Sequence, residues 1–205
     1  IVETDPPYAI YMPMINTFSR ELLQRDLHPL VLSLPTEIGS VGELPACLRD
    51  RPVDGFLLMG ELSRDTMGLF DSLALPYVVV GNEGADSNRT LIQPDVATAT
   101  REAVQRLFEM GHKDIGLVSE RFVSGYSQMI LFAFRQAYRE RELDLKPEWI
   151  QSSGRRLEGG IEPMKRMLAL SNRPTALLFT NIRIAANAYG LAREHGLEIP
   201  GDLSM

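Results

Sequence analysis

The chain has 205 residues, an apolar fraction of 44% and a formal net charge of −6, with acidic and basic residues intermixed. This length can form one large domain or two small ones, and the lack of a basic tract argues against a nucleic-acid surface within these residues. The single cysteine, Cys47, excludes a disulfide framework, and apolar runs of about 18 residues, which a membrane-spanning helix needs, do not occur in the sequence.

Helix and strand patterns alternate along the first half of the sequence. Ile15, Phe18, Leu22 and Leu23 recur at spacings of three and four residues, which predicts one apolar face of a helix. The run Tyr77-Val-Val-Val80 is rich in β-branched residues and predicts a strand. In chain order we expect the end of a strand at 1–2, a helix over 9–25, a strand over 30–32, a short helix over 44–48, a strand within 53–59, a helix over 65–73, a strand over 77–80, a loop over 81–89 and a short strand over 90–92.

A second series of the same kind follows the segment Gln93-Pro94-Asp95. Its clearest part is Glu109–Val118, where a helix ends at Gly111 and a run of apolar residues predicts a strand that is buried on both faces. We expect helices over 97–110, 127–141, 159–170 and 183–195, strands over 115–118, 149–151 and 175–179, and the first half of another strand at 203–205.

Two series of alternating helices and strands predict an α/β protein with two doubly wound parallel-sheet lobes. The first lobe would comprise residues 1–94 and the second residues 95–205, with Gln93, Pro94 and Asp95 as the hinge. A cleft between two such lobes is a favoured place for a small ligand, because the carboxyl ends of the strands of both lobes converge there.

Motifs for catalysis and for nucleotide binding do not occur in the sequence. Neither Gly-x-Gly-x-x-Gly, nor the phosphate-binding loop, nor Gly-x-Ser-x-Gly is present. The three histidines, His28, His112 and His195, have no second His or Cys at the spacing of metal ligands. We therefore expect a protein that is not an enzyme, with no catalytic residue, cofactor or metal site.

Five short motifs stand in one order along nearly the whole chain. They are Val53-Asp-Gly-Phe-Leu-Leu58, Leu75-Pro-Tyr-Val-Val-Val80, Gly111-His-Lys-Asp-Ile-Gly116, Arg173-Pro-Thr-Ala-Leu-Leu-Phe179 and Gly196-Leu-Glu-Ile-Pro-Gly-Asp-Leu-Ser204. In this order and spacing they resemble the effector-binding domain of the LacI/GalR family of bacterial transcription regulators, and the last motif is the most particular to that family. The resemblance implies the periplasmic-binding-protein type I fold.

The resemblance also implies a function. The chain would be the ligand-sensing and dimerisation domain of a cytoplasmic repressor, binding a sugar-like or less polar small-molecule effector in the interlobe cleft and controlling a helix-turn-helix headpiece. Operator DNA would be contacted only through that headpiece, which this sequence lacks, and no membrane partner is expected. The elements that return to the first lobe after residue 205 are lacking too, so both lobes are expected to be incomplete.

A homodimer contact is expected along a helix of the first lobe. Its candidate residues form a Met-rich apolar patch, for which packing in the core is the alternative interpretation. They are Met12, Met14, Ile15 and Phe18.

The expected pocket departs from that of sugar-binding relatives at two positions. The resemblance places an Arg and an Asp of those relatives at Ile130 and Ile182, and core packing is the alternative role of each isoleucine. Replacing both charged groups would remove hydrogen bonds worth about 1.5–3 kcal/mol each. The pocket would then bind a less polar effector, take its polar contacts from other residues, or bind nothing tightly. All candidate effector-binding residues are Tyr8, Tyr11, Asn82, Ser124, Tyr126, Ile130, Arg155, Asn181, Ile182 and Arg183.

Two other classes of protein compete with the regulator. A stand-alone solute-binding protein of a transporter would share the fold, and an α/β enzyme without a recognisable motif is the third class. A helix-turn-helix upstream of these residues would favour the regulator, whereas a signal peptide would favour the solute-binding protein.

Overall fold

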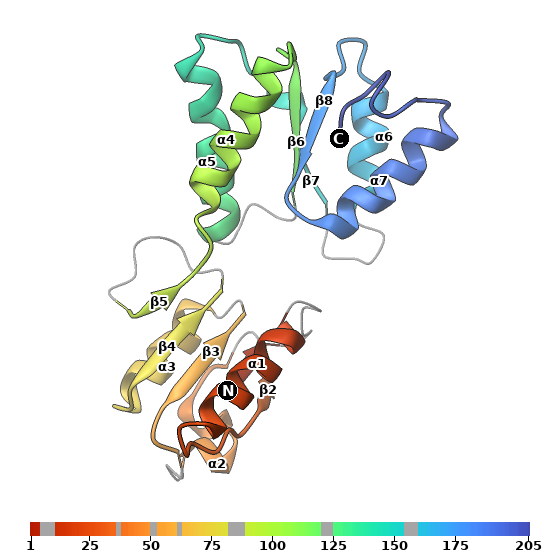
Figure 1. Ribbon diagram of the computed structural model, residues 1–205. Helices are drawn as coiled ribbons and strands as arrows, with labels where there is room; N and C mark the ends of the chain where they lie inside the picture. Colours follow the sequence, from red (N-terminus) through yellow and green to blue (C-terminus); the bar gives the residue numbers. More distant parts are fainter. Residues whose placement is uncertain are drawn as a thin grey trace. The chain divides into compact units, whose positions relative to one another are not determined.

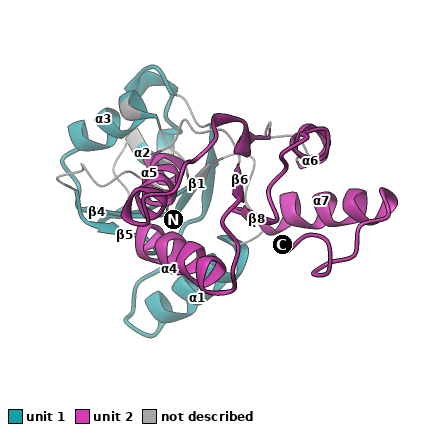
Figure 2. Ribbon diagram, turned by 90° about the horizontal axis from the view of Figure 1, so that it is seen from above, with its two compact units in different colours: residues 1–94 teal, residues 95–205 magenta. Residues whose placement is uncertain are grey.

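The computed structural model describes residues 1–4, 11–35, 38–49, 53–60, 63–81, 89–119, 125–153 and 160–205. The chain divides into two units, Ile1–Pro94 and Asp95–Met205, shown in different colours in Figure 2. The division lies within the segment at which the sequence shows a break between two series of elements.

The first unit contains a five-stranded parallel sheet with the strand order β2-β1-β3-β4-β5 (Figure 1). The strand order reverses beside β1, which is the arrangement of a doubly wound sheet. The strands are β1 (Val2–Thr4), β2 (Leu32–Leu34), β3 (Phe56–Met59), β4 (Tyr77–Val80) and β5 (Leu91–Ile92); the helices are α1 (Tyr11–Leu23), α2 (Ala46–Arg49) and α3 (Arg64–Ser72), with a 3-10 turn η1 (Val41–Glu43).

Apolar side chains cover both faces of this sheet, because neighbouring residues of a strand point to opposite sides. Leu58 of β3 belongs to a buried cluster with Phe70 of α3. The next residue, Met59, belongs to a second cluster with Tyr11 and Ile15 of α1. Helix α1 and helix α3 therefore pack on different faces of the sheet.

The position of the second strand differs from the prediction. Strand β2 begins at Leu32, not at Leu30, because its register pairs Leu32 with Val2 of β1. Leu30 and Val31 precede the paired residues and are each 43% exposed. Hydrophobicity alone placed the strand two residues too early.

The last residue of the apolar face predicted for α1, Leu23, does not lie on that face. The helix ends at Leu23, and this side chain is 55% exposed, whereas Ile15 is buried. Successive residues of a helix are about 100° apart, so Leu23 lies beyond the stripe that contains Ile15 and Leu22.

The second unit contains a three-stranded parallel sheet with the order β7-β6-β8. All five residues of the central strand β6 are buried, and burial of the first four is what the apolar run 115–118 predicts. The strands are β6 (Ile115–Ser119), β7 (Ile150–Ser152) and β8 (Ala176–Phe179); the helices are α4 (Val96–Glu109), α5 (Gly125–Glu140), α6 (Ile161–Leu168) and α7 (Ile182–Glu194), with a 3-10 turn η2 (Pro147–Trp149).

Two layers of helices enclose this second sheet (Figure 1). Ile115 and Leu117 pack in a cluster with Phe134 of α5, and Val118 packs in a different cluster with Ile184 of α7. Helices α4 and α5 thus cover one face, and α6 and α7 cover the other. The prediction of parallel-sheet α/β units is confirmed.

The ends of α4 show how the sequence sets its bounds. The Asp95 carboxylate accepts a hydrogen bond from the Thr98 amide at 3.1 Å and caps the start of the helix. Gly111 follows the helix with a φ of 94°, a left-handed conformation that glycine adopts without strain. The predicted Gly stop is therefore confirmed. At the other end of this unit, only Ser204 of the expected strand pairs, in a single bridge to Ala176.

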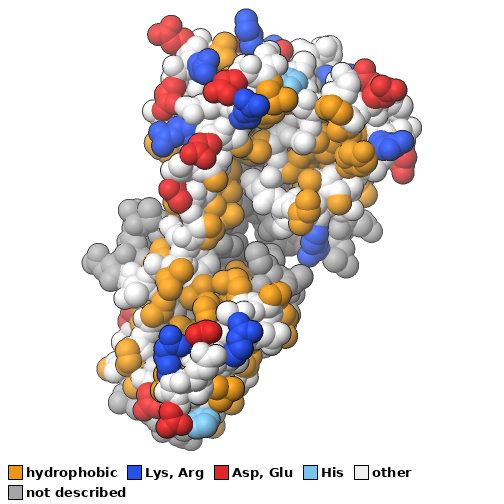
Figure 3. Space-filling model, viewed as in Figure 1, with side chains coloured by type: hydrophobic (Ala, Val, Ile, Leu, Met, Phe, Trp, Pro, Cys, Tyr) orange, Lys and Arg blue, Asp and Glu red, His pale blue; other side chains and the backbone are white. Residues whose placement is uncertain are grey.

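Charged side chains of both signs are interspersed on the face of the molecule in Figure 3. No extended basic surface appears among the side chains described on that face. Within the described residues, no helix is long and apolar enough to span a lipid bilayer.

Candidate functional site

The carboxyl edge of the second sheet carries hydroxyl groups. Strand β6 ends at Ser119, Ser153 follows β7 and Thr180 follows β8. The Thr180 hydroxyl donates to Ser119 Oγ at 3.0 Å, and the Ser153 amide donates to the Ser119 carbonyl at 2.8 Å. Ligands of open α/β sheets bind at this edge, so we take it as the candidate site.

One of these hydroxyls is buried and unpaired within the described ranges of the chain. Ser153 is 3% exposed, and its Oγ has no hydrogen-bond partner among the described residues. Buried polar groups are normally paired, and an unpaired one costs about 1–3 kcal/mol. Ser153 therefore differs from Ser119, whose hydroxyl is bonded to Thr180.

Two helices begin at the same edge. Helix α5 follows β6, and α7 follows β8 through Asn181, whose side chain accepts from the Arg183 amide at 2.8 Å. Neither helix has an acidic residue in its first turn. The first amide groups of a helix carry partial positive charge, so they favour hydrogen-bond acceptors and anions. The described part of the edge thus presents hydroxyls, an amide side chain and two positive helix ends.

Ile130 and Ile182, the two isoleucines expected at the pocket, lie in different environments. Ile130 is 4% exposed and packs in the core cluster with Leu131 and Phe134, and this packing accounts for its apolar side chain without a ligand. Ile182 is the first residue of α7 and is 82% exposed, so core packing does not account for it. Arg183 beside it is also exposed.

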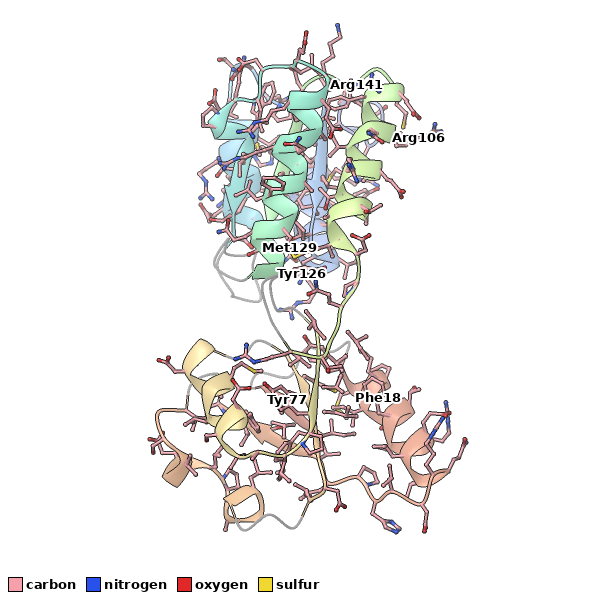
Figure 4. All side chains as sticks on the ribbon, turned by 90° about the vertical axis from the view of Figure 1, so that its left-hand side faces the viewer. Phe18, Tyr77, Arg106, Tyr126, Met129 and Arg141 are labelled. Atoms are coloured by element: carbon pink, nitrogen blue, oxygen red, sulfur yellow. The ribbon has the colours of Figure 1, made fainter. Side chains whose placement is uncertain are left out.

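Tyr126 lies in the first turn of α5, at the candidate edge. Its ring is half-buried against the core of the second unit, as is Met129 one turn later. Figure 4 shows both side chains at the same end of α5, whereas Arg141 lies beyond the opposite end.

The first unit has its own carboxyl edge. Gly60 and Gly81 follow β3 and β4 with φ values of 102° and 138°. Tyr11, 4% exposed, packs with Met59 and Val80, and a Cβ atom on Gly81 would lie 3.3 Å from its hydroxyl oxygen. Tyr11 is thus at this edge. Four other candidates, Tyr8, Asn82, Ser124 and Arg155, lie outside the described residues.

The patch expected to form a dimer contact does not lie on the surface as a unit. Met12 is 49% exposed, and Met14 and Phe18 are half-buried. Ile15 is 4% exposed and packs with Met59, so the alternative interpretation, packing in the core, holds for this residue and its place in the dimer patch is corrected. Its position on α1 faces the sheet, which explains the correction.

The expected hinge residues have distinct surroundings. Asp95 caps α4, and the hydrogen bond from the Thr98 amide holds the pKa of its carboxyl below the usual value. Pro94 is exposed. The Gln93 Oε1 atom is buried and has no hydrogen-bond partner within the described ranges.

A polar cluster at the amino end of the second sheet was not foreseen from the sequence. His112 Nδ1 lies 2.9 Å from Thr175 Oγ1, and His112 Nε2 lies 3.0 Å from Ser204 Oγ. A Ser–His pair can serve as nucleophile and base, but the third group of such triads is a carboxylate or amide that orients the imidazole. Here it is a threonine, and the Ser204 backbone is bonded to β8, which favours a structural role.

A second unforeseen cluster lies in the first unit. Arg89 donates from Nη2 to Asp71 Oδ2 at 2.8 Å and from Nε to the Tyr77 hydroxyl at 2.9 Å, and Tyr77 donates to Asp71. The bond from Arg89 lowers the pKa of Asp71. These charges pair with one another. In the part of the chain that the structure describes, no three His, Cys, Asp or Glu residues are grouped as a metal site would require.

The two parallel sheets with helices on both faces define a doubly wound α/β protein, a fold whose carboxyl edges suit small ligands. Residues 90–205, more than half of the chain, match the family described as periplasmic binding protein-like domain, and the chain belongs to this family. The fold implied by the five sequence motifs is thereby confirmed.

Named relatives point to transcription regulators. The chain is 34% identical over 154 residues to the HTH-type transcriptional repressor PurR of Actinobacillus pleuropneumoniae serotype 3 (strain JL03), covering 75% of this chain and 46% of that protein. It is 32% identical over 158 residues to the ribose operon repressor of Haemophilus influenzae (strain ATCC 51907 / DSM 11121 / KW20 / Rd), covering 77% of this chain and 48% of that protein. The chain thus spans about half the length of these relatives.

Solved structures show the same fold. A regulatory protein of the LacI family from Chloroflexus aggregans matches 99% of this chain and 75% of its own with a TM-score of 0.86 at 23% identity. A LacI family transcriptional regulator from Bifidobacterium animalis subsp. lactis DSM 10140 matches 99% of this chain and 74% of its own, with a TM-score of 0.83 at 24% identity.

Proposed function

We propose that this chain is the effector-sensing domain of a LacI-type transcriptional repressor that acts in the cytoplasm. The observation that carries the proposal is the identity of 34% and 32% to two named repressors over three quarters of the chain. The fold supports it, because the carboxyl edges of parallel sheets suit small ligands. Operator DNA would be bound by a helix-turn-helix elsewhere in the whole protein, and the domain would associate as a homodimer.

The chemistry of the described edge suggests the kind of effector. Thr180 and Asn181 are half-buried residues with neutral hydrogen-bonding groups, Ser119 is buried with its Oγ bonded to Thr180, and Ile182 adds an exposed apolar surface. We propose a small metabolite that combines hydroxyl or amide groups with an apolar part. A neutral hexose that needs charged partners would lose about 1.5–3 kcal/mol for each charge-assisted hydrogen bond that the isoleucines cannot supply.

Control by the effector would require that the effector binds two conformations of the regulator with unequal affinity. The effector would bind one conformation of the regulator more tightly than another, and the population would shift toward the conformation that it prefers. By linkage, operator DNA would then change effector affinity by the same factor.

The first experiment is a thermal-shift panel of sugars, sugar phosphates, nucleosides and less polar metabolites with the whole protein. A metabolite that raises the melting temperature is then tested for its effect on operator binding. A strong response to a neutral hexose at low concentration would contradict the proposed role of the isoleucines. A whole protein that binds metabolites but no operator DNA would support the solute-binding class instead.

The second experiment tests the edge itself. Thr180→Val removes a hydroxyl at the carboxyl edge and should weaken the identified effector roughly threefold to tenfold, which corresponds to one hydrogen bond. Thr175→Val is the matched control, because it removes the same group at the opposite end of β8. Equal affinity of the effector for both variants would contradict the assignment of the carboxyl edge.

A further inference from the structure

A single imidazole joins three segments at the amino end of the second sheet. His112 lies in the turn between α4 and β6, Thr175 precedes β8, and Ser204 bridges to Ala176 of β8. The hydrogen bonds of His112 cross 63 residues to Thr175 and 92 residues to Ser204. Contacts of such separation restrict the chain more than local ones, because they close long loops.

One arrangement of protons satisfies this hydrogen-bond network. The Thr175 hydroxyl is 3.3 Å from the Asp114 carbonyl, which can only accept, so Thr175 donates there. Thr175 Oγ1 is then free to accept from Nδ1–H of His112, and Nε2 accepts from the Ser204 hydroxyl. The neutral Nδ1–H tautomer of His112 thus satisfies every member of the network.

The backbone bridge to β8 by itself holds Ser204 weakly. The Leu177 amide donates to the Ser204 carbonyl at 2.9 Å, and the Ser204 amide donates to the Thr175 carbonyl at 3.0 Å. No neighbouring residue of the described chain extends this bridge into a longer ladder. Two hydrogen bonds contribute about 0.5–1.5 kcal/mol each, whereas ordering each residue costs about 1–2 kcal/mol, so the bridge needs further contacts.

We propose that His112 is a latch that holds residues 203–205 beside β8. The Leu203 side chain, 2% exposed in the cluster of α6 and α7, anchors one side of the segment. His112 anchors Ser204 from the α4–β6 turn and ties it to the residue that precedes β8. The latch sets the position of Ser204 at the edge of β8.

Amide hydrogen exchange on the whole protein tests the latch. In His112→Ala, the amides of Leu177 and Ser204 should exchange roughly tenfold faster, because opening of the bridge no longer breaks the side-chain bonds. The Leu117 amide in the centre of β6 should keep its protection. Lys113→Ala, an exposed neighbour in the same turn, is the matched control and should change neither rate.

Two results would overturn the proposal. One is unchanged exchange of Leu177 and Ser204 in His112→Ala; the other is equal acceleration of Leu117, which would show loss of general stability instead of a latch. If His112→Ala does not fold, Ser204→Ala decides the question, because it removes one bond and keeps the bond of His112 to Thr175. Faster exchange at Leu177 in Ser204→Ala supports the latch, and an unchanged rate there contradicts it.

Discussion

The two ends of the second sheet use polar side chains in opposite ways. At the amino end, His112, Thr175 and Ser204 bond to one another, and the buried Tyr138 hydroxyl bonds to the backbone of Ile115. At the carboxyl edge, Ser153 Oγ is buried without a partner in the described chain, and two helices begin without acidic residues. Polar groups that satisfy one another stabilise the fold, whereas groups with remaining capacity are available to a ligand.

The largest expected effect comes from the amino end. The Tyr138 hydroxyl accepts from the Ile115 amide at 2.7 Å and lies 2.9 Å and 3.1 Å from the carbonyls of Ile115 and Lys113. Tyr138→Phe leaves the buried amide without this partner, so the free energy of unfolding should fall by about 1–3 kcal/mol. Urea denaturation measures the change.

The control for that substitution is Tyr189→Phe on α7. Tyr189 is 41% exposed, whereas Tyr138 is 1% exposed. A surface change of this kind should alter stability by less than about 0.5 kcal/mol. Equal effects of the two substitutions would show that the hydroxyl of Tyr138 is not a structural partner at the amino end.

The same tyrosine predicts how stability responds to alkali. Burial raises the pKa of Tyr138 to about 12, from an ordinary value of 10.0. The folded state therefore keeps the phenol neutral where the unfolded chain ionises it, so this contribution is complete below pH 10 and is lost as the pH rises toward 12. The stability of the wild type should fall over that range more steeply than that of Tyr138→Phe, as measured by urea denaturation at each pH.

The sequence predicts the elements of both ends but not their contacts. The apolar run 115–118 within β6 and glycine at 111 indicate the strand and the helix stop, because these patterns depend on local geometry. The meeting of His112, Thr175 and Ser204 depends on how three distant segments pack, and spacing along the chain does not encode it. The five sequence motifs contain all three residues, but the motifs do not indicate that these residues contact one another.

At the candidate site, too, the surroundings of individual residues could not be predicted from the sequence. The family resemblance placed Ile130 and Ile182 at pocket positions, with core packing as the alternative role; Ile130 is buried in the core, whereas Ile182 is 82% exposed. Ile15 was assigned to a surface patch by composition, although its helical position faces the sheet. The spacing of Ile15 and Leu22 already indicated the apolar side of α1, and the apolar side of a helix normally faces the core.

Replacing the exposed Ile182 by a residue with a carboxylate tests whether the carboxyl edge, unlike the amino end, is open to a ligand. Ile182→Asp puts a negative charge in the first turn of α7, which should stabilise the unit by about 0.3–1 kcal/mol through the helix dipole. It should also introduce a thermal shift with a neutral hexose that the wild type does not show. Ile182→Asn is the control without the charge. A hexose response in the wild type equal to that in the Asp variant would contradict this role of position 182.

The smallest expected loss of stability separates the two ends most directly, because the same substitution is made at both. Ser153→Ala removes a buried hydroxyl that has no described partner, so the free energy of unfolding should stay level or rise, by at most the cost of about 1–3 kcal/mol of an unpaired buried group. Ser204→Ala removes a hydroxyl bonded to His112 and should cost about 1 kcal/mol. Urea denaturation of both variants measures the difference. If Ser153→Ala is the more damaging of the two, then the hydroxyl of Ser153 stabilises the fold, and the carboxyl edge holds no unused capacity at that position for an effector to occupy.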